Sequence, residues 1–324
     1  MISTQNKTIS ARQQFYTDTL KGLKSTPKYM SSKYFYDQKG DQLFQQIMAA
    51  EEYYLTNSEM EILMEQSGQI SKAIAFNREP FDLIELGAGD ATKSIHLLNQ
   101  MVADELDFRY LPIDISENVI NNLSNILPDK IPGIKIEGYN GDYFDMLERI
   151  SALSTRRKVI LFMGANIGNM TVAEAGLFCC KLKGFLTKDD LVIVGFDLKK
   201  NPKQILAAYD DRGGITKAFN LNLLSRINKE LGGDFELDAF EHYASYDPES
   251  GACKSYLISL KDQQVKFGDT ESISFHKNEY IFMEISQKYA LNEIDELAKK
   301  SGFTPVINFI DRKGYFIDSL WNIS

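Results

Sequence analysis

The stretch from Asp82 to Asp90 constrains the fold of this chain more than any other. Its first five residues, Asp82–Leu86, are mostly apolar and predict a buried parallel strand. Gly87 and Gly89 then interrupt the run, and a helical pattern begins at Thr92. In open α/β sheets, a strand, a glycine turn and a helix in this order present backbone N–H groups and a helix N-terminus to a ligand.

The number of glycines indicates which ligand to expect. A dinucleotide fingerprint has three glycines, whereas here the third position holds Thr92. A second predicted strand, 108–113, is followed by Asp114, whose carboxylate can accept hydrogen bonds from a ribose diol. The combination resembles the S-adenosylmethionine (SAM) site of Rossmann-like methyltransferases more than an NAD site. An ordinary strand–helix turn remains an alternative, and an NAD-dependent dehydrogenase is a weaker one.

Composition excludes several classes of protein. A chain of 324 residues with 44% hydrophobic residues can bury a large core in one or two domains. The net charge of −9 argues against nucleic acid as a partner. The chain has no long apolar run, so no membrane span is expected. Three cysteines and three histidines predict neither a disulfide framework nor a metal site. We expect a cytoplasmic protein that acts as a monomer.

Predicted strands and helices alternate through the middle of the chain, which favours a doubly wound parallel sheet. We predict strands at 82–86, 108–114, 134–139, 158–163 and 190–196, and helices at 59–76, 92–102, 116–126 and 172–186. Two closing strands, 303–311 and 315–321, follow a helix at 289–301 and are joined by a short turn, so they must be antiparallel. One antiparallel strand at the end of a parallel sheet is characteristic of SAM-dependent methyltransferases.

The rhythm changes outside this region. Residues 1–60 are predicted to be mainly helical, 202–231 to form two helices, and 234–286 to form mostly strands. The predicted fold is therefore α/β: a Rossmann-like SAM methyltransferase sheet plus a smaller α+β substrate-recognition domain. We assign residues 61–197 and 287–324 to the SAM-binding domain, and residues 1–60 and 198–286 to the substrate-recognition domain.

Longer segments carry a more specific resemblance. They include Ser32–Gly40, Leu43–Phe44, Glu52–Thr56, the loop Gly-Ala-Asn-Ile-Gly-Asn at 164–169, Ala208–Asp211, and Met-Glu-Ile-Ser-Gln-Lys-Tyr at 283–289. In this order they resemble the histidine-specific Nα-methyltransferases of the ergothioneine pathway, over nearly the whole chain. The resemblance implies SAM-dependent Nα-methylation of L-histidine, with three successive transfers that give the trimethyl betaine, hercynine. It also implies SAM as cofactor and a small amino acid as substrate.

The resemblance also implies roles for individual residues. The predicted cofactor-binding residues are Gly87, Gly89, Lys93, Asp114, Asp142 and Tyr143. The resemblance implies that Lys93 meets the SAM carboxylate, Asp114 the ribose hydroxyls, and Asp142 the exocyclic amine of adenine, with Tyr143 beside the adenine ring. The predicted substrate-binding residues are Tyr53, Asn169 and Tyr209, together with Glu284 and Ser286, which share one side of a predicted strand. Tyr36 and Phe44 are the predicted catalytic residues, because aromatic faces stabilise a methylated ammonium. Taken alone, these aromatic residues would be interpreted as core, Lys93 as an exposed helix residue, Asp142 as a helix cap, and Glu284 with Ser286 as a surface pair.

Two alternatives remain open from the sequence. An enzyme of the same family could act on another amino acid, such as a tryptophan derivative. Ser255 supports that possibility, because family enzymes often have a methionine at the corresponding position of the pocket wall. A non-catalytic SAM-binding protein would retain the glycine turn without the substrate residues. The presence of Glu284 and Ser286 favours a histidine methyltransferase.

Overall fold

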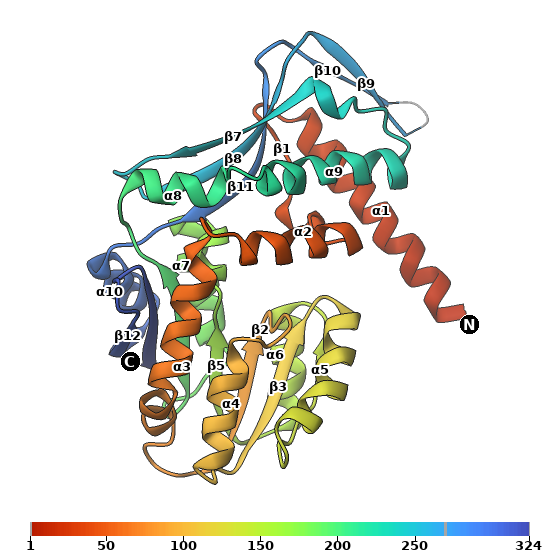
Figure 1. Cartoon of the computed structure of the whole chain (residues 1–324). Coiled ribbons are helices and arrows are strands. Elements are labelled where there is room, and N and C mark those ends of the chain that lie inside the picture. The colour runs from red at the N-terminus through yellow and green to blue at the C-terminus, as the bar shows by residue number, and fades with distance from the viewer. Residues whose placement is uncertain (1, 269–270, 324) are drawn as a thin grey trace. The chain divides into compact units, whose positions relative to one another are not determined.

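The computed structural model describes residues 2–268 and 271–323 of the chain. The chain forms two compact units, and each unit is built from two separate stretches of sequence (Figure 1). Unit 1 comprises Met1–Tyr54 and Lys200–Ser286, and unit 2 comprises Leu55–Lys199 and Gln287–Ser324.

Unit 2 contains a seven-stranded sheet in the order β12-β13-β6-β5-β2-β3-β4. The strands are β2 (Phe81–Leu86), β3 (Phe108–Asp114), β4 (Tyr139–Asn140), β5 (Arg157–Phe162), β6 (Leu191–Asp197), β12 (Phe303–Ile310) and β13 (Phe316–Ile323). β13 runs antiparallel to both of its neighbours, while β2, β3, β4, β5 and β6 pair in parallel. The predicted parallel sheet with one antiparallel strand is confirmed.

Helices flank this sheet. They are α3 (Tyr54–Ile74), α4 (Ser94–Ala103), α5 (Glu117–Lys130), α6 (Tyr143–Leu153), α7 (Val172–Lys183) and α10 (Leu291–Lys300), with a short 3-10 helix, η2 (Asn166–Asn169). Apolar side chains of α6, α7 and α10 pack against β2, β3, β5 and β6 in one core cluster. Because the central strands β2, β5 and β6 are buried along their whole length, their sequences are nearly continuous apolar runs.

Some predicted boundaries were wrong. The strand predicted at 134–139 is reduced to β4 at Tyr139–Asn140, although the segment before it still bonds to Tyr110 through the Lys135 carbonyl and the Glu137 N–H. Gly138 lies in this interrupted segment, where a glycine has no side chain to pack in a strand and a Cβ would lie 2.5 Å from an Ile120 methyl group of α5. The helix predicted from Thr92 begins at Ser94, and the helix predicted from Glu59 begins at Tyr54.

Unit 1 combines the N-terminal segment with the insertion that follows β6. Its helices are α1 (Ile2–Lys24), η1 (Ser32–Tyr34), α2 (Gln38–Ala49), α8 (Pro202–Tyr209), α9 (Ile215–Leu231) and η3 (Leu237–Ala239). Its strands are β1 (Lys28–Tyr29), β7 (Phe240–Tyr246), β8 (Ala252–Ser259), β9 (Gln263–Phe267), β10 (Glu271–Phe275) and β11 (Tyr280–Gln287).

The two sequence stretches of unit 1 share a sheet and a core. The sheet has the order β1-β11-β8-β7, and β1 pairs in parallel with β11 through Lys28 and Ile281. β9 and β10 form a separate two-stranded ribbon. Phe35 and Leu43 of the N-terminal stretch belong to the same buried cluster as Phe219 and Met283 of the insertion. The N-terminal stretch and the insertion therefore fold as one body.

Candidate functional site

The glycine turn after β2 has a backbone conformation that favours glycine. Gly87 has φ +74° and Gly89 has φ +54°, both in the left-handed region. The Gly87 N–H donates to the Ile113 carbonyl at 2.8 Å, which ties the turn to the end of β3. A Cβ at residue 87 would lie 2.7 Å from the Tyr143 hydroxyl oxygen. Gly87 is therefore needed for its backbone angle and for the space that its missing side chain leaves.

Asp114 lies beside this turn, although 25 residues separate it from Gly89. One carboxylate oxygen accepts the Gly89 N–H at 3.2 Å, and the other accepts the Ser116 N–H at 2.9 Å. Burial raises the pKa of Asp114, while these backbone donors act in the opposite direction. A carboxylate that holds two N–H groups still has lone pairs for further donors. The arrangement can therefore accept hydrogen bonds from a diol.

Asp142 and Tyr143 lie at the start of α6. Asp142 is exposed, and its side chain caps the helix by accepting the Phe144 N–H at 2.9 Å. The Tyr143 ring contacts Phe162 edge-on, with 6.0 Å between the ring centroids. Burial raises the pKa of Tyr143 to about 12, so its hydroxyl stays protonated at neutral pH. Asp142 therefore has the structural role of a helix cap, and its predicted contact with adenine stays a prediction.

Lys93 is not the freely exposed helix residue that its sequence context alone would suggest. It lies at the N-terminus of α4 and forms an ion pair with Glu59 of α3. Glu59 is fully buried, and its second oxygen accepts the Gly164 N–H at 2.6 Å. Glu59 was not predicted from the sequence, although it lies three and four positions before Ile62 and Leu63 and therefore on the same face of the helix.

Glu85, at the end of β2, is a buried acid beneath the glycine turn. The Tyr110 hydroxyl donates to one of its oxygens at 2.5 Å. Burial raises the pKa of Glu85 to about 7, although the bond from Tyr110 acts in the opposite direction. Glu85 is therefore a titratable group next to the turn, near neutral pH.

In unit 1, Tyr209 and Ser286 are brought into direct contact. The Tyr209 hydroxyl, at the end of α8, lies 2.7 Å from the Ser286 hydroxyl of β11. The ring of Tyr53 meets the ring of Tyr209 edge-on, with centroids 6.2 Å apart. The Tyr209 carbonyl lies 2.9 Å from Nε2 of the buried His242 on β7. Three of the predicted substrate-binding residues thus form one cluster, and His242 is a neighbour that the sequence did not predict.

Glu284 lies on β11, two residues before Ser286. Its side chain is partly exposed, between the buried residues Met283 and Ile285. Ser255 is buried on β8, where it pairs with Ala244 of β7. The predicted strand position of Glu284 and Ser286 is thus correct, while their roles as substrate ligands stay predictions.

Tyr36 and Phe44 also lie together in unit 1. Their rings meet edge-on with centroids 5.6 Å apart, and Phe219 of α9 lies 6.0 Å from each ring. The local sequence explains this position, because Asp37 caps α2 by accepting the Gly40 N–H at 2.7 Å. Tyr36 is 45% exposed, so its ring is accessible at the edge of the cluster.

Asn169 is the predicted substrate residue that belongs to unit 2. It is exposed at the end of η2, in the loop after β5. The loop begins with Gly164 at φ +73° and Ala165 at φ +55°. Gly168 has no room for a side chain, because a Cβ there would lie 2.9 Å from the Gln287 carbonyl oxygen. The glycines of the 164–169 loop therefore have steric reasons that sequence inspection could not reveal.

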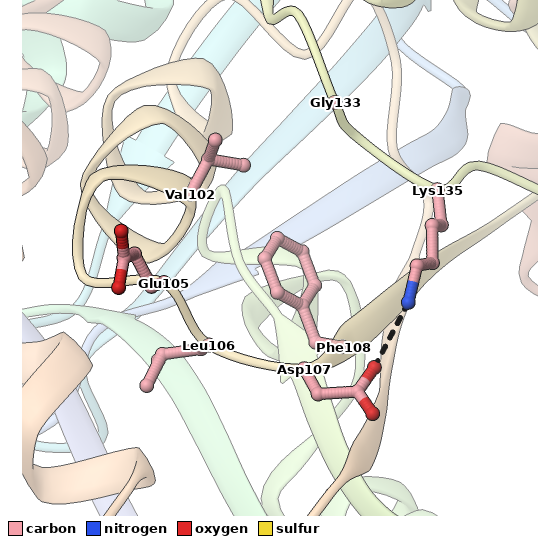
Figure 2. Close-up of a pocket in the computed structure, with 7 residues that line it drawn as sticks. All are labelled: Val102, Glu105, Leu106, Asp107, Phe108, Gly133 and Lys135. Carbon is pink, nitrogen blue, oxygen red and sulfur yellow. Dashed lines mark hydrogen bonds and ion pairs between the residues drawn. The ribbon is translucent and has the colours of Figure 1, made fainter.

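The structure also has a cavity of about 280 Å³ beside the start of β3 (Figure 2). Its lining includes Glu105, Phe108 and Gly133, and an ion pair of 3.0 Å joins Asp107 to Lys135. Phe108 begins β3, whereas Asp114 ends it about 20 Å away. This cavity is therefore not part of the candidate site.

Comparison with known proteins assigns the family. The model of a family described as histidine-specific, SAM-dependent methyltransferase matches residues 15–323. A histidine N-alpha-methyltransferase of Mycolicibacterium smegmatis is 34% identical over 292 residues, which cover 90% of this chain and 89% of that protein. The chain belongs to the histidine-specific, SAM-dependent methyltransferase family. The family, the enzyme class and SAM as cofactor are therefore confirmed.

Other proteins with similar sequences carry different names. The ergothioneine biosynthesis protein 1 of Schizosaccharomyces pombe is 27% identical over 286 residues, which cover 86% of this chain and 37% of that protein. An L-tryptophan methyltransferase of Psilocybe serbica is 28% identical over 324 residues, which cover 92% of this chain and 89% of that protein. Similarity of overall sequence thus extends to relatives named for a second amino acid.

The residues of unit 2 fit SAM. The bare backbone at Gly87 and Gly89 gives close access to the ends of β2 and β3, and the Asp114 carboxylate lies there with acceptor capacity for ribose hydroxyls. The Lys93 ammonium is paired with Glu59, and its contact with the SAM carboxylate stays a prediction. None of the helices in the described ranges is long and apolar enough to cross a membrane. Within those same ranges, no group of three His, Cys, Asp or Glu residues could hold a metal ion.

Proposed function

We propose that this methyltransferase transfers methyl groups from SAM to the α-amine of L-histidine, in three successive steps that end in hercynine. Family membership supports the reaction. The observation that carries the choice of substrate is the cluster in unit 1, where the Tyr209 and Ser286 hydroxyls lie 2.7 Å apart and Glu284 is two residues away. We assign reading of the amino acid to unit 1 and SAM binding to unit 2, where Lys93 is the proposed ligand of the SAM carboxylate and Tyr143 the proposed neighbour of the adenine ring.

Glu284 and Ser286 are the proposed readers of the imidazole ring. A carboxylate accepts a hydrogen bond from a ring N–H, and a hydroxyl can pair with the other ring nitrogen in either protonation state. Each hydroxyl can both donate and accept, and the bond between Tyr209 and Ser286 uses one donor and one acceptor. This pair can therefore be oriented before the substrate binds.

Asn169 and Tyr209 are the proposed ligands of the α-carboxylate and α-amine. The amine must lose its proton before it reacts, so its partners must serve both a cationic and a neutral nitrogen. An amide side chain offers both a donor and an acceptor, which suits this change. Bound SAM supplies an electrophilic methyl group. Tyr36 and Phe44 present aromatic faces that stabilise the positive charge that the nitrogen acquires.

Glu284→Ala and Glu284→Gln test the proposal. Loss of a charge-assisted hydrogen bond to imidazole should lower kcat/KM for histidine about 10- to 100-fold. Binding of S-adenosylhomocysteine, measured by calorimetry, should stay unchanged. Glu241→Gln is a matched control, because Glu241 is an exposed acid on β7 of the same sheet, separated from β11 by β8. Wild-type histidine kinetics in both Glu284 variants would remove this residue from the substrate site.

A second experiment separates the alternatives. The purified protein is incubated with SAM and single amino acids, and products are identified by the mass of one, two or three added methyl groups. We expect histidine to gain three groups and tryptophan to gain none at comparable enzyme concentration. Methylated tryptophan without methylated histidine would move the protein to the tryptophan relatives. No product from any amino acid would instead support a SAM-binding protein without catalytic activity.

We further propose that the enzyme acts as a monomer in the cytoplasm, without nucleic acid. The net charge of −9 supports the last point, because phosphate backbones bind basic surfaces. Light scattering during gel filtration would test the first.

A further inference from the structure

A buried set of charged groups surrounds Lys93, and only the lysine was predicted from the sequence. Glu59 of α3 and Asp318 of β13 are both 0% exposed. The Lys93 ammonium forms an ion pair with Glu59, and its nitrogen lies 3.5 Å from where a Cβ of residue 164 would stand. The three ionisable groups come from an early helix, the loop after β2 and the last strand.

Glu59 connects two loops of the SAM-binding unit. One of its oxygens pairs with Lys93, beyond the glycine turn of β2, and the other accepts the Gly164 N–H, directly after β5. Room for this carboxylate comes from Gly195 of β6, where a Cβ would lie 2.7 Å from the Glu59 oxygen. A single side chain therefore fixes both the lysine and the start of the loop that carries Asn169.

Within this set, the ion pair to Lys93 comes from Glu59. Both Asp318 carboxyl oxygens lack a hydrogen-bond partner within the described part of the chain. Burial raises the pKa of Asp318 well above its usual range, and Glu59 raises it further against the opposing effect of Lys93. Burial therefore favours the neutral form of Asp318, and Glu59 is the carboxylate that forms the ion pair with Lys93.

We propose that Glu59 is a positioning residue for SAM, which acts by holding the Lys93 ammonium where it meets the carboxylate of the SAM amino-acid portion. The inference rests on the proposed function, in which Lys93 is the ligand of that carboxylate. Lysine has a flexible four-carbon stem and three N–H donors. When Glu59 engages one donor, the direction of the other two is restricted. Glu59 itself makes no contact with the ligand.

Two ligands that differ in the amino-acid portion separate this role from a purely structural one. S-adenosylhomocysteine contains the carboxylate, whereas 5′-methylthioadenosine keeps the nucleoside and sulfur but lacks the carboxylate. Glu59→Gln should weaken binding of S-adenosylhomocysteine about 10-fold and change binding of methylthioadenosine by less than about twofold, both measured by calorimetry. General damage to the fold would weaken both ligands equally and would overturn the proposal.

Glu61→Gln is the control on the same helix, because the Glu61 side chain binds Arg312 and not Lys93. It should bind both ligands like the wild type. Glu59→Asp serves as a second variant if the glutamine variant folds poorly. Its shorter side chain keeps the charge but cannot reach both Lys93 and Gly164, so a selective loss for S-adenosylhomocysteine is again expected. Equal binding of both ligands to this variant and to the wild type would contradict the proposal.

Lys93→Met separates failure of this inference from failure of the proposed site. If Lys93→Met weakens the binding of S-adenosylhomocysteine but not of methylthioadenosine, and the Glu59 variants do not, the lysine is a ligand and Glu59 does not position it. If Lys93→Met has no selective effect, the assignment of Lys93 itself fails, and the role of Glu59 fails with it. A gain in affinity for S-adenosylhomocysteine in Glu59→Gln would show that the acid repels the carboxylate, and would also overturn the proposal.

Discussion

Replacement of Gly87 or Gly89, the two glycines of the glycine turn after β2, by alanine should have unequal effects on stability. Both residues have positive φ angles, so alanine at either position introduces backbone strain of about 1–2 kcal/mol. Beyond this shared term, a Cβ at residue 89 meets no atom within 4 Å, whereas a Cβ at residue 87 would lie 2.7 Å from the Tyr143 hydroxyl. Overpacking of this kind adds about 1–3 kcal/mol.

Gly87→Ala should therefore lower the free energy of unfolding by about 2–5 kcal/mol, against about 1–2 kcal/mol for Gly89→Ala. The structure also predicts a rescue. Without the Tyr143 hydroxyl, the nearest atoms to the new Cβ would be Asn166 Nδ2 at 3.3 Å and Tyr143 Cζ at 3.6 Å. In a Tyr143→Phe background, Gly87→Ala should thus destabilise no more than Gly89→Ala does.

Urea unfolding of the ligand-free protein, followed by circular dichroism, measures these free energies. The reasoning is refuted if Gly87→Ala and Gly89→Ala destabilise equally, or if Tyr143→Phe leaves the effect of Gly87→Ala unchanged. Calorimetry then adds a functional test. Displacement of Tyr143 by the new methyl group should weaken the binding of S-adenosylhomocysteine, because Tyr143 is the proposed neighbour of the adenine ring.

Two further predictions concern buried charges. The pKa of Glu85, raised from 4.5 to about 7, lies above its unfolded value, so its stabilising contribution is complete below pH 4.5 and is lost as the pH rises through 7. The free energy of unfolding of Glu85→Gln, relative to that of the wild type, should therefore rise by about 3 kcal/mol between pH 4.5 and pH 8. Urea unfolding at each pH measures this difference. A difference that stays constant over this pH range would contradict the prediction. Lys288 and Asp197 form a 2.6 Å ion pair in which both side chains are fully buried, so Lys288→Met should destabilise by about 3–5 kcal/mol. Lys300→Met, which removes an exposed pair with Glu296, should change stability by less than about 1 kcal/mol and serves as its control.

Local patterns predicted the sheet of unit 2 well. Buried parallel strands are largely apolar runs, and β2, β5 and β6 follow this pattern apart from a few charged residues such as Asp82, Arg157 and Asp197. The prediction failed at the sheet edge, where 134–139 has a strand-like sequence but forms only β4. Space for Ile120 of α5 requires Gly138 there, and a sequence pattern does not contain that steric requirement.

The sequence by itself determined the order of strands and helices, the glycine turn with Asp114, the antiparallel final hairpin and the family. These features depend on residues close together in the chain or on the order of motifs along it. Only the tertiary structure decided that Glu59 and Asp318 surround Lys93, and that Tyr209 meets Ser286. Such contacts join residues far apart in sequence. The sequence around an acidic residue on an amphipathic helix is the same whether that residue faces water or pairs with a lysine. Which charges pair is therefore decided by which elements pack together. A buried charged group is unfavourable unless the fold places a partner beside it.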